Sequence, residues 1–451
     1  MRSVSAWIVL LGFVLAGRIG AEEPPQPPPA GWSLREVIAL AVQRNPDLAG
    51  ARARAEAALA RVGEAESAFF PQLGARITFA RTDDPSRAFG MILSQRRFTF
   101  NTNFNRPGPT QDVRPEVLAA VPLFHGGQDY FRRQAAQAGA RAARAEEVAS
   151  RNAVIDAAAQ AYYALLAAPE QVAVMQASLS AVRSALENAR ARFAAGAALK
   201  SDVLSLEARL QATEAAAVRA RNAVELARSA LRLVLALPAT EEVAVSPAAE
   251  VGPTLPASFS DALARARTQR AELVAMRELV AAREAEVAAE RAAFLPRVDL
   301  IGSYGQNATD LRLSSSRDNW FFGATAEVDL FSGFRTLQRL RAAEHNLEEA
   351  RQLEAKTQAV IEHEVRVAFS NWEEARQRLE ASEAAVAAAE EALRLVTEQY
   401  RAGTVIVTRY LEAEAARTEA RSQAVAARYE LNRSAATLRK AMGSWEEEME
   451  P

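Results

Sequence analysis

Cysteine is absent from this chain, and large apolar side chains are few. Without cysteine there can be no disulfide bond, no thiolate metal site and no lipid attached to a cysteine behind an export signal. Aromatic residues make up 7% of the chain, and alanine supplies much of the 49% hydrophobic share. Together with 24% charged residues, this composition favours long, closely packed helices over a bulky globular core.

Excess charge and histidine are also scarce. The formal net charge is -2, so nothing favours a nucleic-acid partner. The three histidines are His125, His345 and His363, and no two of them have the i, i+4 spacing of a metal-binding helix. We also find no nucleophile arrangement, phosphate-binding glycine loop or paired catalytic carboxylates. We therefore expect no metal, no cofactor and no enzyme activity.

Long apolar runs are missing after the N-terminus. Residues 1–21 have the pattern of a secretory signal, with Arg2, an apolar run and small residues before Glu22. Their removal would take away two arginines and no acid, so the net charge of -2 would become -4. Residues 22–32 form a Pro-rich tether. Since no later run approaches the ~20 residues of a membrane helix, we expect an exported protein without a helical anchor.

An internal duplication organises the remainder of the chain. Gly196 and Gly403 lie 207 residues apart, each between two long helical patterns and each shortly after an aromatic residue. Two helical hairpins with the same tip predict two structural repeats. We place the first repeat at 33–236, an equatorial connector at 237–257, the second repeat at 258–443 and a tail at 444–451.

Both repeats have the same predicted order of elements. The hydrophobic period changes from helical to alternating after Pro71 and again after Pro296. The helix that enters each tip has about 68 residues, or ~100 Å, which predicts a rod with strands at one end and tips at the other. The elements expected are helix 33–70, strands 72–81 and 113–124 and hairpin 128–236, then helix 258–295, strands 297–306 and 319–331 and hairpin 335–443.

The predicted strands have one apolar and one polar face. Their length and alternation are those of membrane-spanning β-strands. Four strands cannot close a barrel and an open edge cannot lie in a bilayer, so two, three or four protomers would have to combine. The alternative is a soluble α+β domain in which helices cover the strands. The lipid-facing residues expected are Leu73, Ile77, Phe79, Val121, Leu123, Val298, Leu300, Trp320, Phe322, Val328 and Leu330.

Several motifs, in this order and spacing, resemble the TolC-type outer-membrane efflux proteins. They are GWSLREVIALAVQRNPDL, FFPQL, LFHGG, FLPRV, LFSGF and YRAGT followed by YLEAE, and the resemblance covers nearly all of 32–443. It implies an α+β membrane protein in the bacterial outer membrane with a periplasmic extension. In such a homotrimer a 12-stranded β-barrel continues into a coiled-coil tunnel of helices.

The same resemblance implies partners and a function. The tunnel would dock to a periplasmic adaptor protein that is linked to an inner-membrane pump, and would passively conduct drugs, metal ions or secreted polypeptides. A periplasmic coiled-coil adaptor or a structural coiled-coil protein are the alternatives. An adaptor should show a lipoyl-like domain and an anchor, and a structural protein would not need the strands. Cargo and pump class stay open.

The resemblance also places functional residues at the tips. The family often carries acidic residues there that tighten a gate, and Asp202 keeps this pattern whereas Arg409 replaces an acid in the second repeat. Ion pairs across neighbouring helices would close the tunnel; the alternative is a helix cap for Asp202 and solvated positions for the others. The docking candidates are Phe193, Gly196, Val203, Leu204, Tyr400, Gly403 and Leu411. The gate candidates are Asp202, Arg409, Tyr410 and Glu412.

Overall fold

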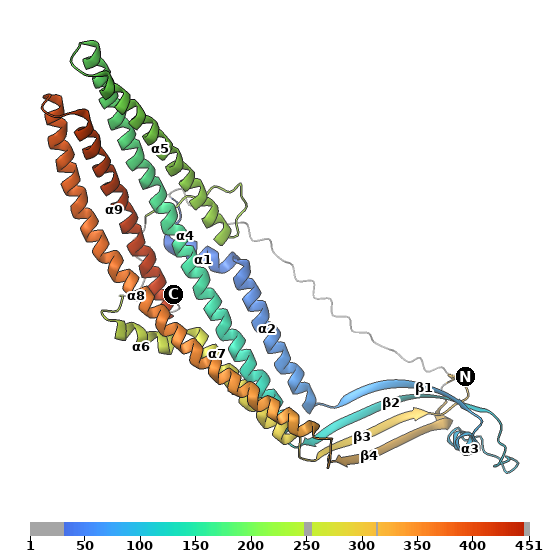
Figure 1. Ribbon diagram of the computed structural model, residues 1–451. Helices are drawn as coiled ribbons and strands as arrows, with labels where there is room; N and C mark the ends of the chain where they lie inside the picture. Colours follow the sequence, from blue (N-terminus) through green and yellow to red (C-terminus); the bar gives the residue numbers. More distant parts are fainter. Residues whose placement is uncertain (1–30, 248–254, 313, 446–451) are drawn as a thin grey trace.

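The computed structural model describes residues 31–247, 255–312 and 314–445, and shows an elongated molecule with strands at one end (Figure 1). The expected signal 1–21 lies outside the described residues. So do 22–30 of the tether, 248–254 of the connector and 446–451 of the tail.

The elements follow one another in two similar series. The first consists of α1 (Leu34–Arg44), α2 (Pro46–Glu66), a 3-10 turn η1 (Ser67–Phe69), β1 (Gln72–Thr82), α3 (Pro85–Ser94), β2 (Thr110–His125), α4 (Gln128–Ala194) and α5 (Lys200–Val234). The second consists of α6 (Phe259–Gln269), α7 (Ala271–Ala292), β3 (Arg297–Gln306), a 3-10 turn η2 (Ser315–Arg317), β4 (Asp318–Glu327), α8 (Arg335–Arg401) and α9 (Val407–Met442). Helix α3 was not predicted.

The first helical segment of each repeat is divided in two. Between α1 and α2, the Asn45 side chain accepts a hydrogen bond from the Asp47 amide at 2.9 Å, and Pro46 starts the next helix. The second break, at Arg270, has no proline and was not predicted within 258–295. There the buried Arg270 guanidinium pairs with Glu272 at 2.9 Å and Glu364 at 2.8 Å, so contacts distant in sequence fix the break.

The four strands form one antiparallel sheet in the order β1-β2-β3-β4. Its register aligns Ala75, Val117, Tyr304 and Trp320 in one row. Because side chains alternate along a strand, this row and every second row beside it make one apolar face. Most of the predicted apolar positions lie on this face, namely Leu73, Ile77, Phe79, Val121, Val298, Leu300, Trp320 and Phe322.

Three residues predicted to face lipid lie outside the apolar rows of the sheet. A register shift between Pro122 and Phe124 places Phe124, rather than Leu123, opposite Val298 in the apolar row. Strand β4 ends at Glu327 instead of 331, so Val328 and Leu330 lie beyond the sheet. The apolar alternation continues in the sequence beyond this point, so the pattern did not reveal where the strand ends. The strand ends there because β3 has no further residue to pair with β4.

The helices are arranged side by side as a curved layer. Helix α4 packs against α2 and α5 on one side and against α7 and α9 on the other, and α8 packs against α7 and α9 (Figure 1). Two shorter helices thus accompany each long one end to end. Within the described part of the chain, α2 with α5 forms one edge of this layer and α8 forms the other. The strands show the same arrangement, with β1 and β4 as the two edges.

The connector ties the two repeats together at mid-height. Trp32 and Ser246 share a backbone hydrogen bond at 3.0 Å, and the Tyr162 hydroxyl donates to the Ser246 carbonyl at 2.6 Å. Tyr162, Trp32 and Trp445 lie in the largest cluster of buried apolar side chains. Smaller clusters lie between α6 and α8 and at the helical tips. The apolar core is therefore concentrated at the equator and the tips.

Equivalent helix ends in the two repeats should respond oppositely to exchange of glycine and alanine. The residue after α9 is Gly443 with φ +79°, whereas the equivalent position 207 residues earlier, two residues after α5, holds Ala236 with φ 52°. We expect Ala236→Gly to stabilise the protein by about 1 kcal/mol, because a Cβ disfavours this conformation. Gly443→Ala should destabilise it, since a Cβ there would lie 2.8 Å from the Gln269 backbone. Thermal unfolding in detergent measures both, and a shift in the same direction would contradict this account.

Candidate functional site

The two helical tips have the same backbone geometry. Gly196 and Gly403 both have φ +74°. The amides that follow each glycine close the end of the preceding helix, with Ala197 donating to the Arg192 carbonyl at 2.7 Å and Thr404 to that of Gln399 at 3.0 Å. At each tip the chain therefore reverses direction through a defined, hydrogen-bonded turn and not through a loose linker.

The docking candidates divide into exposed and packed residues. Phe193 and Leu204 are exposed at the first tip, whereas Val203 is buried and Tyr400 and Leu411 are half-buried. Two apolar residues were missed: Leu199 is 68% exposed and Ile406 71%. They occupy equivalent positions, immediately before α5 and α9. An apolar residue where a helix usually has a polar cap was the sequence signal for them.

Aromatic stacking and one arginine join the two tips. The rings of Tyr400 and Tyr410 are stacked with centroids 5.4 Å apart. Arg192, from the other hairpin, lies 5.7 Å from the Tyr400 ring centroid and donates to the Tyr400 carbonyl at 3.1 Å. Burial, reinforced by the charge of Glu414, raises the pKa of Tyr410. Within one protomer Tyr410 is therefore a packing residue, and its role in a gate stays a prediction for the assembled protein.

The gate candidates do not pair across helices within one protomer. Among the described residues, the salt-bridge partner of Arg409 is Glu412 on the same helix, at 3.3 Å, with both side chains exposed. Such a pair contributes about 0–1 kcal/mol. Asp202 lies half-buried in the first turn of α5. The gating role of Asp202, Arg409 and Glu412 stays a prediction for the assembled protein.

A buried carboxylate just above the tips connects the two hairpins. Glu414 on α9 is fully buried and accepts hydrogen bonds from Ser178 of α4 at 2.5 Å and from Thr418 at 2.8 Å. Arg209 of α5 lies 3.3 Å away and Arg417 3.7 Å. Its equivalent in the first repeat, Glu207, pairs with Arg190 near the surface. Sequence analysis missed Glu414, because a glutamate on a helix with mixed faces gives no sign of burial.

At the opposite end, an ionic cluster joins the sheet to the long helix. His125 ends β2, and its ring nitrogens lie 2.6 Å from Asp129 of α4 and 2.9 Å from Asp299 of β3. Two carboxylate partners require both nitrogens to donate, which is the imidazolium form. The row His125, Arg297 and Glu327 is the last row of the ladder, at the end of the sheet next to the helices, and lies on the same polar face as Asp299. The sequence analysis considered His125 only as a metal ligand and gave no sign of these two partners.

The sheet has the dimensions and edges of a membrane-spanning segment. Strands β3 and β4 have 10 residues each, or about 33 Å, enough to cross a ~25 Å apolar band when tilted. None of the helices in the described ranges is long and apolar enough to cross a membrane. Exposed aromatic residues gather where strands meet helices, as in the girdles at membrane interfaces. They are Phe69, Phe70, Phe124, Tyr130, Phe294, Phe331 and Phe334.

The longer loop of the first repeat is fixed at the outer end of the sheet. Gln95 donates to Asp112 at 2.9 Å, and Asn307 donates to the other oxygen of Asp112 at 2.6 Å. Arg96 donates to the Asp318 carbonyl at 2.8 Å. Four phenylalanines then form a ring cluster in which Phe100 is fully exposed. The loop is therefore an ordered part of the outer end.

The chain belongs to the outer membrane efflux protein family, whose model matches residues 37–237 and 262–444. It is 26% identical to the outer membrane protein TolC of Vibrio cholerae over 443 residues, 93% of each chain. It is also 26% identical to the alkaline protease secretion protein AprF of Pseudomonas aeruginosa, over 62% of this chain and 59% of that protein. The Campylobacter jejuni CmeC outer membrane channel has the same fold, with a TM-score of 0.78, 19% identity and coverage of 91% and 85%.

The predicted fold class, location and function are thereby confirmed. The protein is an outer-membrane exit duct: a helical tunnel continues a β-barrel to which each protomer contributes four strands. The apolar face of the sheet carries most of the residues predicted to face lipid, and that orientation stays a prediction. The polar face carries Arg76, Glu116 and Asp299.

Removal of the buried carboxylate should destabilise the protein far more than removal of its exposed counterpart. Glu414→Ala leaves Arg209 and Arg417 without their buried partner, which costs about 3–5 kcal/mol. Glu207→Ala removes the equivalent residue of the first repeat and should cost less than about 1 kcal/mol. Thermal unfolding of the two variants in detergent makes the comparison. Equal losses would show that Glu414 does not hold the hairpins together.

The contribution of His125 to stability should decline as the pH rises. Burial lowers the pKa of His125, but the hydrogen bonds and charges of Asp299 and Asp129 outweigh it and raise the pKa above its ordinary value. A group whose pKa is higher in the folded state stabilises the protein at pH values below its pKa in the unfolded state. This contribution is lost as the pH rises through the pKa of the folded state. The difference in melting temperature between wild type and His125→Gln should thus shrink from pH 5 to pH 9. His345→Gln, on an exposed helix face, is the control. A difference in melting temperature that does not change with pH would show that this histidine is not a charged imidazolium in the folded protein.

Proposed function

We propose that three copies of this chain form the exit duct of a tripartite efflux or type I secretion assembly. The duct would receive cargo from a periplasmic adaptor protein and an inner-membrane pump. It would conduct cargo passively and without enzyme activity. Support for both kinds of assembly comes from the family, named for efflux, and from a relative named for protease secretion.

Apolar stripes on both edges of the helical layer support assembly into a closed tunnel. On α8, Leu353, Val360 and Val367 are exposed at intervals of seven residues, the spacing of a coiled-coil seam. On α5 the exposed residues are Val218, Leu226 and Leu233. Two different edges that meet give a head-to-tail ring, and three protomers with four strands each give the 12 strands that the resemblance implies.

The exposed apolar residues at the tips carry the adaptor proposal. Leu199 and Ile406 are exposed directly before α5 and α9. These two turns are at the end of the rod farthest from the sheet (Figure 1). Apolar side chains that protrude into water at a rigid turn mark a surface for a protein partner. Gly196, Gly403, Phe193 and Leu204 complete this surface in the proposal. Arg409 and Glu412 would lie beside it, where ion pairs between protomers could restrict the opening.

Charge at the apolar tips should abolish transport without affecting assembly. In the double variant Leu199→Asp and Ile406→Asp, two desolvated carboxylates would oppose docking, and drug resistance or secretion in a strain with the cognate pump should fall at least about tenfold. Ser201→Asp, which adds a charge to the same tip without removing apolar surface, is the matched control. Heat-sensitive trimers on gels check assembly. Normal transport by assembled double variant would overturn the docking role.

A further inference from the structure

The two edge strands of the sheet are each paired along one side only. Strands β1 and β4 lie at opposite edges, and among the described residues neither has a second neighbour (Figure 1). An unpaired edge cannot lie in hydrocarbon. In the trimer of the proposed function, on which this inference rests, β4 of one protomer therefore meets β1 of the next. We call this contact the strand seam.

The internal duplication is preserved in the strand register. Gln72 of β1 lies opposite Ala120 of β2, and Arg297 of β3 lies opposite Glu327 of β4. Arg297 follows Gln72 by 225 residues, and Glu327 follows Ala120 by 207 residues. All pairs of β3 with β4 follow the same two offsets. The remaining pairing, β2 with β3, joins the first repeat to the second. In a closed ring the strand seam is the same kind of contact, from the second repeat to the first repeat of the next protomer.

The pairing of β2 with β3 therefore predicts which residues meet at the strand seam. Within the protomer Ala120 lies opposite Ile301. The two offsets carry this pair to Glu327 of one protomer and Arg76 of its neighbour. Two apolar residues are thus replaced by two residues of opposite charge. Opposite charges directly across from each other stabilise a pair of strands.

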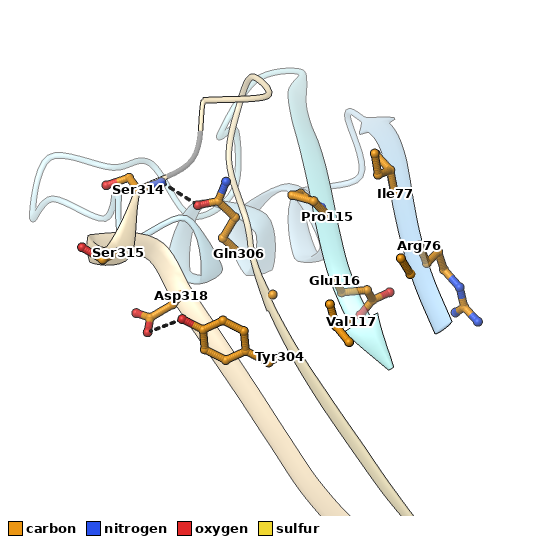
Figure 2. A pocket seen from close by; sticks show the side chains of 12 residues that line it. Arg76, Ile77, Pro115, Glu116, Val117, Tyr304, Gln306, Ser314, Ser315 and Asp318 are labelled. Atoms are coloured by element: carbon orange, nitrogen blue, oxygen red, sulfur yellow. Dashed lines mark hydrogen bonds between the residues drawn. The ribbon is translucent and has the colours of Figure 1, made fainter. Parts of the chain in front are cut away.

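Both charged residues are placed to form this pair. They lie on the polar face of the sheet, and Arg76 is exposed, with its side chain pointing away from β2 (Figure 2). The salt bridges found among the described residues leave Arg76 without a partner. Glu327 contacts Arg297 through Oε2 alone, at 2.9 Å and 3.3 Å. Its Oε1 can therefore accept a hydrogen bond from a second guanidinium.

The sizes of the side chains also agree with this register. Gly305 of β3 prevents a clash, since a Cβ there would lie 2.7 Å from the Glu116 Cβ. The equivalent pair at the strand seam is Ala80 with Gly323, so a glycine again removes one of the two Cβ atoms. On the apolar face each pair combines a smaller with a larger side chain. These pairs are Ala324 with Phe79, Ala326 with Ile77 and Val328 with Ala75.

The residues that follow β4 fit the same pattern. Beyond Ala120, β2 pairs with β3 alone as far as His125. The equivalent stretch after β4 is 328–332, in which Val328 and Phe331 are exposed. The strand pattern of these residues, which have no partner within the sheet, is thereby explained by a neighbouring β1.

We propose that neighbouring protomers join in this one register, with Glu327 of one protomer paired to Arg76 of the next and 328–332 extending β4 along β1. A shift by one residue would place polar side chains on the apolar face. A shift by two residues is the competing register, because it would place Asp329 opposite Arg76.

Cysteine pairs test the register directly, because the chain has no cysteine of its own. Ala75→Cys is combined in turn with Ala326→Cys, Val328→Cys or Leu330→Cys and oxidised in isolated outer membranes. Only Val328→Cys should form a disulfide, since the two Cα atoms must lie about 4.4–6.8 Å apart and two residues along a strand add ~6.6 Å. Because β1 and β4 are opposite edges of one sheet, the bond links protomers and gives covalent dimers and trimers on non-reducing gels.

The same gels distinguish the possible failures. A disulfide with Ala326→Cys or Leu330→Cys in place of Val328→Cys would overturn the register. Heat-sensitive trimers in which none of the three pairs forms a disulfide would overturn the contact of β4 with β1 itself. Absence of trimers from the wild type would instead contradict the proposed function, and this inference with it.

The ion pair is tested separately by combining substitutions. Arg76→Gln and Glu327→Gln should each lower the temperature at which the trimer dissociates in detergent by a few degrees. The double variant should be no less stable than Glu327→Gln alone, because both changes remove one interaction. Arg81→Gln, on the same strand but opposite Phe322 in this register, is the matched control, and its effect should add to that of Glu327→Gln. Additive effects of Arg76→Gln and Glu327→Gln would overturn the pair.

Discussion

Backbone hydrogen bonding in lipid is the constraint on which the rest of this structure depends. A four-stranded sheet has two edges, here β1 and β4, and the unpaired amides and carbonyls of an edge cannot be solvated by hydrocarbon. A single protomer therefore cannot satisfy the hydrogen bonds of its sheet in a membrane. The helical layer repeats this condition, since α5 and α8 carry apolar stripes on its two edges. Both the sheet and the helical layer therefore need neighbouring protomers to cover their edges.

Polar contacts hold the hairpins together where the apolar core is thin. The alanine-rich helices approach closely but bury little hydrophobic area away from the equator and the tips. Between α4 and α9, Gln171 and Ser422 exchange two hydrogen bonds, and Tyr429 donates to Glu170 at 2.6 Å. Glu414 continues this series toward the tips. Such directional contacts fix the register of long helices that could otherwise slide along similar small side chains.

The two repeats have similar backbones but differ in the side chains at equivalent positions. The position that is a surface glutamate in the first repeat, Glu207, is the buried Glu414 in the second. The helix end that has Gly443 in the second repeat has the less suitable Ala236 in the first. Among the described residues, the first repeat alone has the longer loop with α3, and Arg96 of this loop donates a hydrogen bond to the Asp318 carbonyl at the start of β4. Duplication therefore supplied the architecture, and local substitutions supplied the distinct surfaces.

The sequence by itself determined the features that depend on local pattern. Alternation placed the strands and most residues of the apolar face, and the repeated glycine turns placed the tips, because periodicity and positive φ are properties of short segments. Tertiary structure decided what depends on residues distant in sequence. The break at Arg270, the shift that exchanges Leu123 for Phe124, the end of β4 and the partners of His125 and Glu414 were all outside the reach of sequence analysis. Burial and charge pairing are set by neighbours across space, and a sequence pattern records only neighbours along the chain.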